Sequence, residues 1–288
     1  PISIDEGSRE VYLPHETGVS LSTRDHENEY KRVSMADLMT EANYLNPDVE
    51  VIAEVNTPES FETFAEVLNT GHGVVGTTHA EDVETLVNRV VEQGLPAYLL
   101  RELDVVVFPR RVDGERYVGS VVELLSADAY EEIPASARTG VVEKDGTTLY
   151  YNTLLWREPD GSFGMAYDHP DLGGDRAATD GETHRNALCV FHRLAAATDS
   201  DPDAIEREFR RKRGYVEYLL REGVTDVSQL FGFLSDLRTD EAATVERVRR
   251  QQAGDSAGEA STATDSHGAG GSRDMDSTAP TGHGGGGR

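Results

Sequence analysis

Carboxylate and imidazole side chains lie at three points of one segment of the sequence, residues 48–82. Glu54 follows an apolar run, His72 lies between two glycines, and His79 comes just before a helical pattern. A carboxylate at the carboxyl end of a parallel strand can order water around Mg²⁺ or polarise a water that attacks a phosphate. A helix that begins after His79 would attract an anionic phosphate to its N-terminus. The segment therefore indicates a site for nucleotide phosphates.

Each of these residues also has a simpler explanation. Glu54 alone is typical of a surface strand, and His72 alone is typical of a turn. His72, His79 and Asp82 are residue types that bind metals, so an unrelated metallohydrolase is an alternative, but their spacing matches no familiar zinc pattern. The order of the three residues along one segment is what favours the phosphate site.

The first 125 residues alternate strand-like and helix-like patterns. Strands are expected at residues 2–4, 11–13, 48–55, 74–78 and 105–108, and helices at residues 33–44, 59–68 and 80–93. Strands that alternate with helices favour an α/β fold with a mostly parallel sheet covered on both faces. In such a sheet the carboxyl ends of the strands gather at one edge, where ligands bind.

The pattern changes after residue 125. A hairpin is expected over residues 141–151 with its turn at Asp145-Gly146, followed by a loop at 168–182 and by helices at 183–197, 202–222 and 227–250. From residue 252 onward there is no Leu, Ile, Val or aromatic residue, so this part cannot bury enough apolar surface to fold. The sequence thus predicts a first domain at 1–125, an accessory region at 126–250 and a disordered tail at 251–288.

The charge of the chain limits its partners. Among 288 residues, 27 are basic and 53 are acidic, which gives a net charge of −26. Such a chain repels phosphate backbones, and its densest basic run, residues 210–213, lies beside Glu206 and Glu208 in the pattern of a charged helix face. We therefore expect no nucleic acid as a partner. Acidic residues spread over the whole chain, with only three lysines, are typical of a halophilic protein that stays soluble in molar salt.

The lengths of the apolar runs and the number of cysteines exclude a membrane-spanning helix and a fold held by disulfides or by cysteine-bound zinc. No apolar run approaches the roughly 18 residues of a membrane-spanning helix, and no signal-peptide pattern opens the chain. Cys189 is the single cysteine, which excludes an intrachain disulfide and a Cys-based zinc site. Its apolar neighbours indicate a small buried hydrophobic residue, not a nucleophile.

Several of these segments together resemble the secretion (traffic) ATPases that drive type II secretion and the assembly of type IV pili or the archaellum, in particular their archaeal branch. Glu54 falls at the family's Walker B glutamate, and residues 70–80 resemble its histidine box, with His72 and His79 at the signature positions. Residues 4–10 are similar to its aspartate box. Two later segments, at 149–163 and 206–226, resemble the C-terminal region of the archaeal branch, so the resemblance covers about residues 1–250.

This resemblance implies a fold and a set of partners. The fold would be the C-terminal part of a RecA-like P-loop ATPase core followed by a mostly helical accessory region. The chain would bind ATP and Mg²⁺, form a homo-oligomer that is a hexameric ring, and act on a membrane platform protein. Its place would be the cytoplasm, peripheral at the inner face of the cell membrane.

The resemblance also implies roles for individual residues. Glu54 would organise Mg²⁺ through water, and either Asp5 or Glu6 would activate the attacking water. The residues expected to sense the terminal phosphate are His72, His79 and Arg24. All of these side chains would then converge around the terminal phosphate of the nucleotide.

Departures from the family pattern define an alternative. No GxxxxGK[ST] segment occurs in the 288 residues, which with Pro1 as the first residue predicts a partial chain that binds ATP poorly by itself. The acidic pair reads Asp5-Glu6 instead of Glu-Asp, Ala53 replaces a glycine, and arginines are replaced at the positions of Asn56 and Tyr44. Lost cations favour the alternative of a non-hydrolysing structural or regulatory subunit of the same ring.

Overall fold

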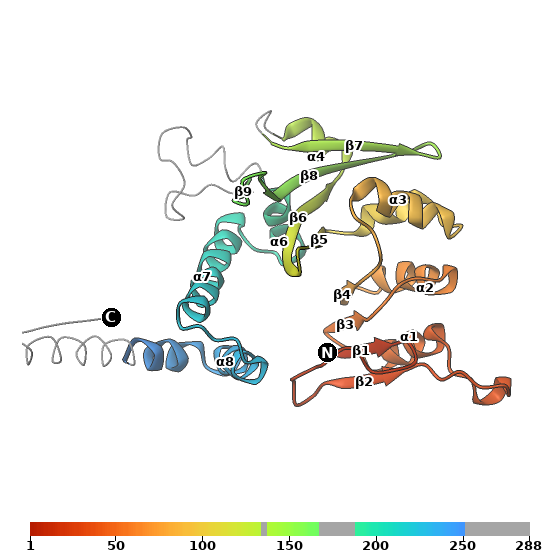
Figure 1. Cartoon of the computed structure of the whole chain (residues 1–288), viewed down its shortest axis with the longest axis horizontal. Helices are drawn as coiled ribbons and strands as arrows, with labels where there is room; N and C mark the ends of the chain where they lie inside the picture. Colours follow the sequence, from red (N-terminus) through yellow and green to blue (C-terminus); the bar gives the residue numbers. More distant parts are fainter. Residues whose placement is uncertain (134–136, 167–187, 251–288) are drawn as a thin grey trace, which may run out of the picture. The chain divides into compact units, whose positions relative to one another are not determined.

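The computed structural model describes residues 1–133, 137–166 and 188–250, and its first compact unit runs from Pro1 to Val224 (Figure 1). This unit begins with a sheet of four parallel strands in the order β2-β1-β3-β4. The strands are β1 (Ile2–Asp5), β2 (Val19–Ser22), β3 (Val49–Ile52) and β4 (Gly73–Gly76). Because all four are parallel, their carboxyl ends share one edge of the sheet.

Three amphipathic helices accompany this sheet: α1 (Met35–Tyr44), α2 (Pro58–Leu68) and α3 (Val83–Glu92). Each begins at a side chain that accepts a hydrogen bond from the first turn, namely Ser34, Thr57 and Asp82. Their apolar faces form one core with the strands. The α/β fold predicted from the sequence is therefore confirmed, and the helices and the strands after residue 33 lie close to their expected limits.

Two details of the first sheet differ from the prediction. Helices α1 and α2 contact each other on one face of the sheet, whereas we expected helices on both faces. They share this face because the crossovers from β2 to β3 and from β3 to β4 run in the same direction along the sheet. The strand expected at 11–13 does not form; these residues belong to a loop, and the second strand is β2. A one-turn 3-10 helix, η1 (Glu29–Lys31), follows β2.

A second sheet is antiparallel and takes strands from both sides of residue 125. Its order is β5-β6-β8-β7, with β9 paired to β8. The strands are β5 (Val105–Val112), β6 (Glu115–Leu125), β7 (Thr139–Lys144), β8 (Thr147–Arg157) and β9 (Phe163–Met165). The predicted hairpin is confirmed as β7–β8, and both of its turn residues, Asp145 and Gly146, have positive φ as a type I′ turn requires.

Short helices join this sheet to the rest of the unit. The 3-10 helix η2 (Ala97–Glu102) precedes β5, and α4 (Ala127–Glu132) follows β6. After them come α6 (Cys189–Ala197) and α7 (Pro202–Arg221). The fully buried carboxylate of Glu123 accepts hydrogen bonds from the backbone N–H groups of Cys189 (3.1 Å) and Val190 (2.6 Å). Strand β6 thereby holds the N-terminus of α6.

The second compact unit, Thr225–Arg288, contains α8 (Val227–Thr239) and a further helical stretch at 241–250. We expected one helix over 227–250, but the helix ends before Asp240, whose side chain caps the next turn. The domain limits at 125 and 250 stay predictions. The expected loop at 168–182, the start of the helix at 183 and the tail at 251–288 lie outside the described residues.

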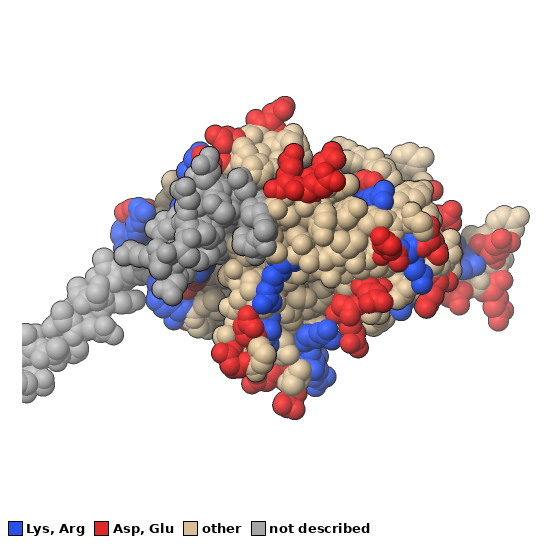
Figure 2. All heavy atoms as spheres, turned by 90° about the horizontal axis from the view of Figure 1, so that it is seen from above, with Lys and Arg blue, Asp and Glu red and all other residues tan. Residues whose placement is uncertain are grey.

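The surface of the molecule carries both signs of charge. Figure 2 shows acidic side chains spread over the face that it presents, with basic side chains between them. Within the described ranges, no helix is long and apolar enough to cross a membrane.

Candidate functional site

The carboxyl edge of the parallel sheet brings four of the expected site residues into one row. Following the strand order β2-β1-β3-β4, the chain reaches Arg24, Glu6, Glu54 and His79 shortly after each strand ends. Neighbouring strands lie about 4.8 Å apart, so the row spans about 14 Å. This is the edge at which parallel sheets bind ligands.

Glu54 and His79 form the centre of this row. His79 Nε2 lies 2.7 Å from Glu54 Oε1, and the two side chains are 75% and 35% exposed. Two threonines join the segments that carry them: the hydroxyl of Thr77 donates to the carbonyl of Ala53, and that of Thr78 donates to the carbonyl of Val55 at 2.7 Å. The pair is therefore held by backbone on both sides while it stays open to solvent.

The surroundings of Glu54 keep it ionised. Asn56 is the largest cause of the lowered pKa of Glu54, with His79 and the charge of Arg89 acting in the same direction against desolvation. Arg89, from α3, donates through Nη2 to Asn56 Oδ1 at 2.9 Å. A carboxylate that is anionic and partly exposed suits a group that accepts protons or binds metal-bound water.

Arg89 is missing from the residues that the sequence singled out. It lies 33 positions after Asn56, and no short-range spacing connects them. The available signal was an arginine within the apolar face of the helix predicted at 80–93, between the buried Val87 and Val90. Such a residue either is exposed or has a partner inside the fold.

Asp5, predicted as a possible base, is occupied by its own loop. Its side chain is fully buried, and Oδ1 accepts hydrogen bonds from the N–H groups of Glu10 (2.8 Å) and Val11 (2.9 Å). Ser3 donates to the other oxygen at 3.4 Å. Of the acidic pair, Glu6 is the exposed member and Asp5 shapes the loop.

Arg24 holds the loop after β2. Its Nε donates to the carbonyl of Lys31 at 2.6 Å, and its backbone pairs with Val33. It occupies the end of the row farthest from His79, three strand positions away.

His72 lies at the opposite edge of the sheet, so the expected convergence of both histidines is wrong. His72 precedes β4 and His79 follows it, so the four residues of β4, which span about 13 Å at about 3.3 Å per residue, lie between them. The strand between them is extended, and residues close in sequence therefore reach opposite edges. His72 lies instead beside Glu50 of β3, with 3.4 Å between Nδ1 and Oε1.

Glu50 is the acidic residue that the sequence left unnoticed. It is fully buried, and neither carboxylate oxygen has a hydrogen-bond partner among the described residues, although His72 lies at ion-pair distance. Burial raises the pKa of Glu50, and the neighbouring His72 opposes this rise. Glu50 alternates with Val49 and Val51 in the predicted strand at 48–55, so the pattern would place it on an exposed face and gave no signal of its burial.

The donor set decides which metal fits. Within the described residues, no three His, Cys, Asp or Glu side chains gather to hold a metal ion. Mg²⁺ needs only one or two carboxylates when phosphate oxygens and water complete its shell, and Glu54 offers one at the open edge. The residues therefore fit Mg²⁺ with a nucleotide. They do not fit a metallohydrolase that uses His72 and His79 together, because the two lie at opposite edges.

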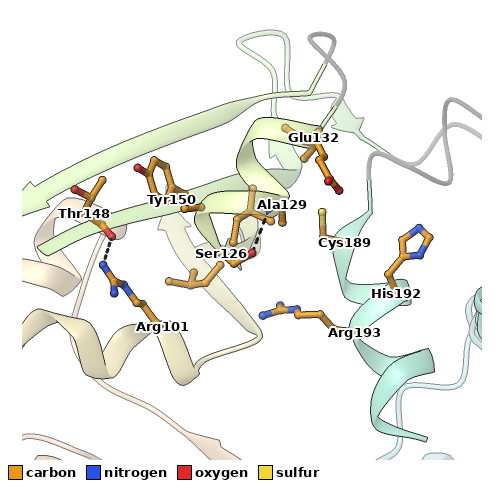
Figure 3. A pocket seen from close by; sticks show the side chains of 13 residues that line it. Arg101, Ser126, Ala129, Glu132, Thr148, Tyr150, Cys189, His192 and Arg193 are labelled. Carbon is orange, nitrogen blue, oxygen red and sulfur yellow. Dashed lines mark hydrogen bonds between the residues drawn. The ribbon is translucent and has the colours of Figure 1, made fainter. Parts of the chain in front are cut away.

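The first compact unit contains two cavities, one beside the parallel sheet and one beside the antiparallel sheet. A cavity of about 940 Å³ reaches His79 between α2, β4 and β5, and its lining is apolar apart from a few residues such as His79 and Glu81. A second, of about 820 Å³, contains Arg101, Arg193 and Cys189 (Figure 3). Burial and then the charges of Glu123 and Glu132 raise the pKa of the Cys189 thiol to about 11 against the opposing charge of Arg193, so the thiol stays protonated at neutral pH. This agrees with the expectation that Cys189 is not a nucleophile.

Comparisons with known proteins find similarity to part of this chain. Residues 2–116 match the family model described as Type II/IV secretion system protein. The uncharacterized protein MJ0900 of Methanocaldococcus jannaschii is 30% identical over 105 residues, which are 36% of this chain and 19% of that protein. The chain thus spans about a fifth of the length of this relative.

The solved structures that match this chain do so at low sequence identity and over less than half of each chain. The VirB11 ATPase from the Brucella suis type IV secretion system is 25% identical, with a TM-score of 0.34 over 42% of this chain and 40% of that chain. The Legionella pneumophila ATPase DotB is 16% identical, with a TM-score of 0.32 over 42% and 37% of the two chains.

Proposed function

We propose that this chain is part of an ATP-hydrolysing motor subunit of an archaeal secretion or type IV pilus assembly system, and the match of residues 2–116 to the family model described as Type II/IV secretion system protein supports this proposal. The observation that carries this proposal is the Glu54–His79 pair at the carboxyl edge of the parallel sheet, at 2.7 Å. An anionic carboxylate beside an imidazole at this edge suits a water and an anionic phosphate.

Three residues of the row, Glu54, Glu6 and His79, have a role in this proposal. Glu54 accepts hydrogen bonds from the water that surrounds the metal, and Glu6 accepts the proton of the attacking water. His79 donates to a phosphate oxygen and stabilises its developing charge. Bound Mg²⁺ supplies charge neutralisation on the phosphates. His72 takes no part, and Asp5 holds the loop that presents Glu6.

We infer the assembly and its location from the resemblance of residues 2–116 to this family. The motor is proposed to be a homo-oligomer, a hexamer, that binds ATP between subunits and acts on a membrane platform protein from the inner face of the cell membrane. The main grip on the phosphates would come from a GxxxxGK[ST] segment, which the 288 residues do not contain.

A non-hydrolysing subunit of the same ring is the second candidate. It is favoured by Asn56, which stands directly beside Glu54 where the family resemblance leads one to expect a cation. Tyr44 is a weaker argument, because α1 runs antiparallel to the strands and ends on the side of their amino ends, away from Glu54.

Hydrolysis by the natural protein that contains this chain distinguishes the candidates. We expect Mg²⁺-dependent ATPase activity in molar salt that falls about 100-fold or more in Glu54→Gln. Glu62→Gln, an equal change on the exposed side of α2, is the control and should keep full activity. Stoichiometric ATP binding without hydrolysis in the unaltered protein would select the non-hydrolysing subunit.

A further inference from the structure

Strand β5 carries an arginine that reaches the segment holding His79. Arg110 donates through Nη2 to the backbone carbonyl of Glu81 at 3.0 Å, and its Nη1 lies 3.2 Å from Glu81 Oε2. Glu81 follows His79 by two residues and directly precedes Asp82, the N-terminal cap of α3. Two contacts from one guanidinium to one residue therefore connect the antiparallel sheet to the loop at the ligand edge.

The loop formed by residues 77–81 is held by hydrogen bonds at both ends. At its start, two threonine hydroxyls donate to the backbone carbonyls on either side of Glu54. At its end, the carbonyl of Glu81 accepts the hydrogen bond from Arg110. His79 lies between these two ends and is 75% exposed, so packing does not fix its ring. The position of the imidazole therefore depends on the backbone that both sets of bonds hold.

A bulge in the antiparallel sheet makes room for Arg110. Strand β6 has one extra residue, Gly119, opposite the step from Phe108 to Pro109 on β5. Proline has no N–H to donate to the ladder, and such a position in a sheet is typical of a bulge. A Cβ added at Gly119 would overlap Cγ of Arg110 and lie 3.1 Å from the carbonyl oxygen of Phe108. The glycine thus leaves the space that the stem of Arg110 fills on its way to Glu81.

Exposure of the ion pair separates its effect on geometry from its effect on folding. The side chains of Arg110 and Glu81 are 41% and 79% exposed. An ion pair this exposed contributes little to the free energy of unfolding. Removal of the Arg110 guanidinium should therefore leave the chain folded and change the loop at the ligand edge.

We propose that Arg110, placed by the bulge at Gly119, is a positioning residue for His79 and acts by holding the carbonyl of Glu81 at the end of the loop. With Arg110 in place, the loop keeps the imidazole 2.7 Å from Glu54. The effect of this role on hydrolysis rests on the proposed function. The contact with Glu81 requires no nucleotide and is tested first.

The imidazole of His79 reports on the loop directly. In ¹H–¹⁵N spectra of the histidine rings of the whole chain in molar salt, Arg110→Met should move the His79 signals toward those of an exposed, unpaired histidine. His79→Asn removes these signals and so identifies them. Arg111→Met is the matched control, because Arg111 is the next residue of β5 and projects from the other face of the strand. Unchanged His79 signals in Arg110→Met would overturn the proposal.

A second variant displaces Arg110 without removing its charge. The methyl group of Gly119→Ala should push the stem of Arg110 aside and move the His79 signals in the same direction as Arg110→Met. Gly214→Ala adds the same group on α7, where no other part of the described structure lies within 4 Å of it, and should leave the signals unchanged. A folded Gly119→Ala variant with unchanged His79 signals would overturn the role of the bulge.

Activity tests the role in hydrolysis. In the natural ATP-hydrolysing protein, Arg110→Met should lower kcat about tenfold and change KM for ATP less than about twofold, because a displaced loop misplaces a group that acts in the transition state. Glu81→Gln keeps the backbone carbonyl and should lose less activity than Arg110→Met. Arg110→Lys, which can make one of the two contacts, should have a smaller loss than Arg110→Met.

The outcomes separate the two proposals. A full kcat in Arg110→Met, or a loss confined to KM, would overturn the role of Arg110 in hydrolysis while leaving the motor assignment in place. Absence of hydrolysis in the unaltered protein would overturn the motor assignment, and the His79 signals would still decide whether Arg110 holds the loop.

Discussion

Two Glu–His pairs join the same two strands, and they differ in almost every physical respect. Glu54 and His79 meet at the carboxyl edge, where both are open to solvent and the neighbouring Asn56, His79 and Arg89 favour the ionised carboxylate. Glu50 and His72 meet at the amino edge, where the carboxylate is fully buried and its oxygens have no hydrogen-bond partner among the described residues. The pKa of the first glutamate is lowered and that of the second is raised.

The difference teaches that residue type does not decide the role of a carboxylate in this sheet. Both pairs consist of the same groups at comparable distances, 2.7 Å and 3.4 Å. Hydrogen-bond donors keep Glu54 anionic, whereas loss of water favours the neutral form of Glu50. We therefore assign chemistry to the open pair and a structural contribution to the buried pair.

The largest expected effect is on ATPase activity, which should depend on Glu54 and not on Glu50. Glu54→Gln should lower ATPase activity of the natural protein about 100-fold or more, because it removes the negative charge at the ligand edge. Glu50→Gln replaces the buried carboxyl group at the other edge and should change activity less than about twofold, provided that the variant is folded. Steady-state rates in molar salt measure both, and similar losses in the two variants would erase the distinction.

Stability should show the reverse order. His72→Ala leaves a buried carboxylate without its partner and should reduce the free energy of unfolding by up to about 3 kcal/mol. His79→Ala removes an exposed partner and should cost at most about 1 kcal/mol. Denaturant unfolding of the chain at neutral pH compares them, and an equal cost would show that Glu50 is not stabilised by His72.

The contribution of Glu50 to the stability of the fold should depend on pH. The folded-state pKa of Glu50 lies above its value of 4.5 in the unfolded chain, so the folded state retains a proton that the unfolded state releases. The contribution of Glu50 to stability is therefore present in full below pH 4.5 and is lost as the pH rises through the folded-state pKa.

The matched comparison for this pH effect is Glu50→Gln, which cannot titrate. The stability of the unaltered protein relative to this variant should fall from pH 4 toward neutral pH in denaturant titrations. A difference that stays constant or grows with pH would contradict the raised pKa.

The smallest effect concerns the threonine that holds the open pair. Thr78→Val removes the hydroxyl that donates to the carbonyl of Val55 and should cost about 1 kcal/mol of stability. Thr40→Val makes the same change at an exposed position of α1, where the hydroxyl donates within the helix, and should cost less. Thermal unfolding of the two variants measures the difference, and an equal cost would show that the Thr78 bond does not hold the two segments together.

Local patterns were sufficient to predict much of the fold. The helices α1, α2 and α3 follow from apolar residues at helical spacing and from capping residues, and the β7–β8 hairpin follows from Asp145-Gly146. Strand β2 was missed, because Val19–Ser22 has a short and weak pattern and obtains its place from pairing with β1. Long-range pairing is not visible in local periodicity.

The candidate site was predictable only in part for the same reason. Glu54 and His79 follow neighbouring strands, and the rule that carboxyl ends share an edge is enough to bring them together. His72 required knowledge of where β4 begins, since one extended strand carries the chain from one edge to the other. Arg89 required the rotation of α3 against Asn56, which no spacing in the sequence specifies.

The central claim is that the open pair faces the terminal phosphate of a nucleotide and the buried pair does not. A structure of the natural protein with Mg²⁺ and a non-hydrolysable ATP analogue tests this most directly. We predict that Glu54 and His79 lie within hydrogen-bond reach of the terminal phosphate or one water away from it, with His72 still beside Glu50. A terminal phosphate bound away from Glu54 and His79 would contradict the account.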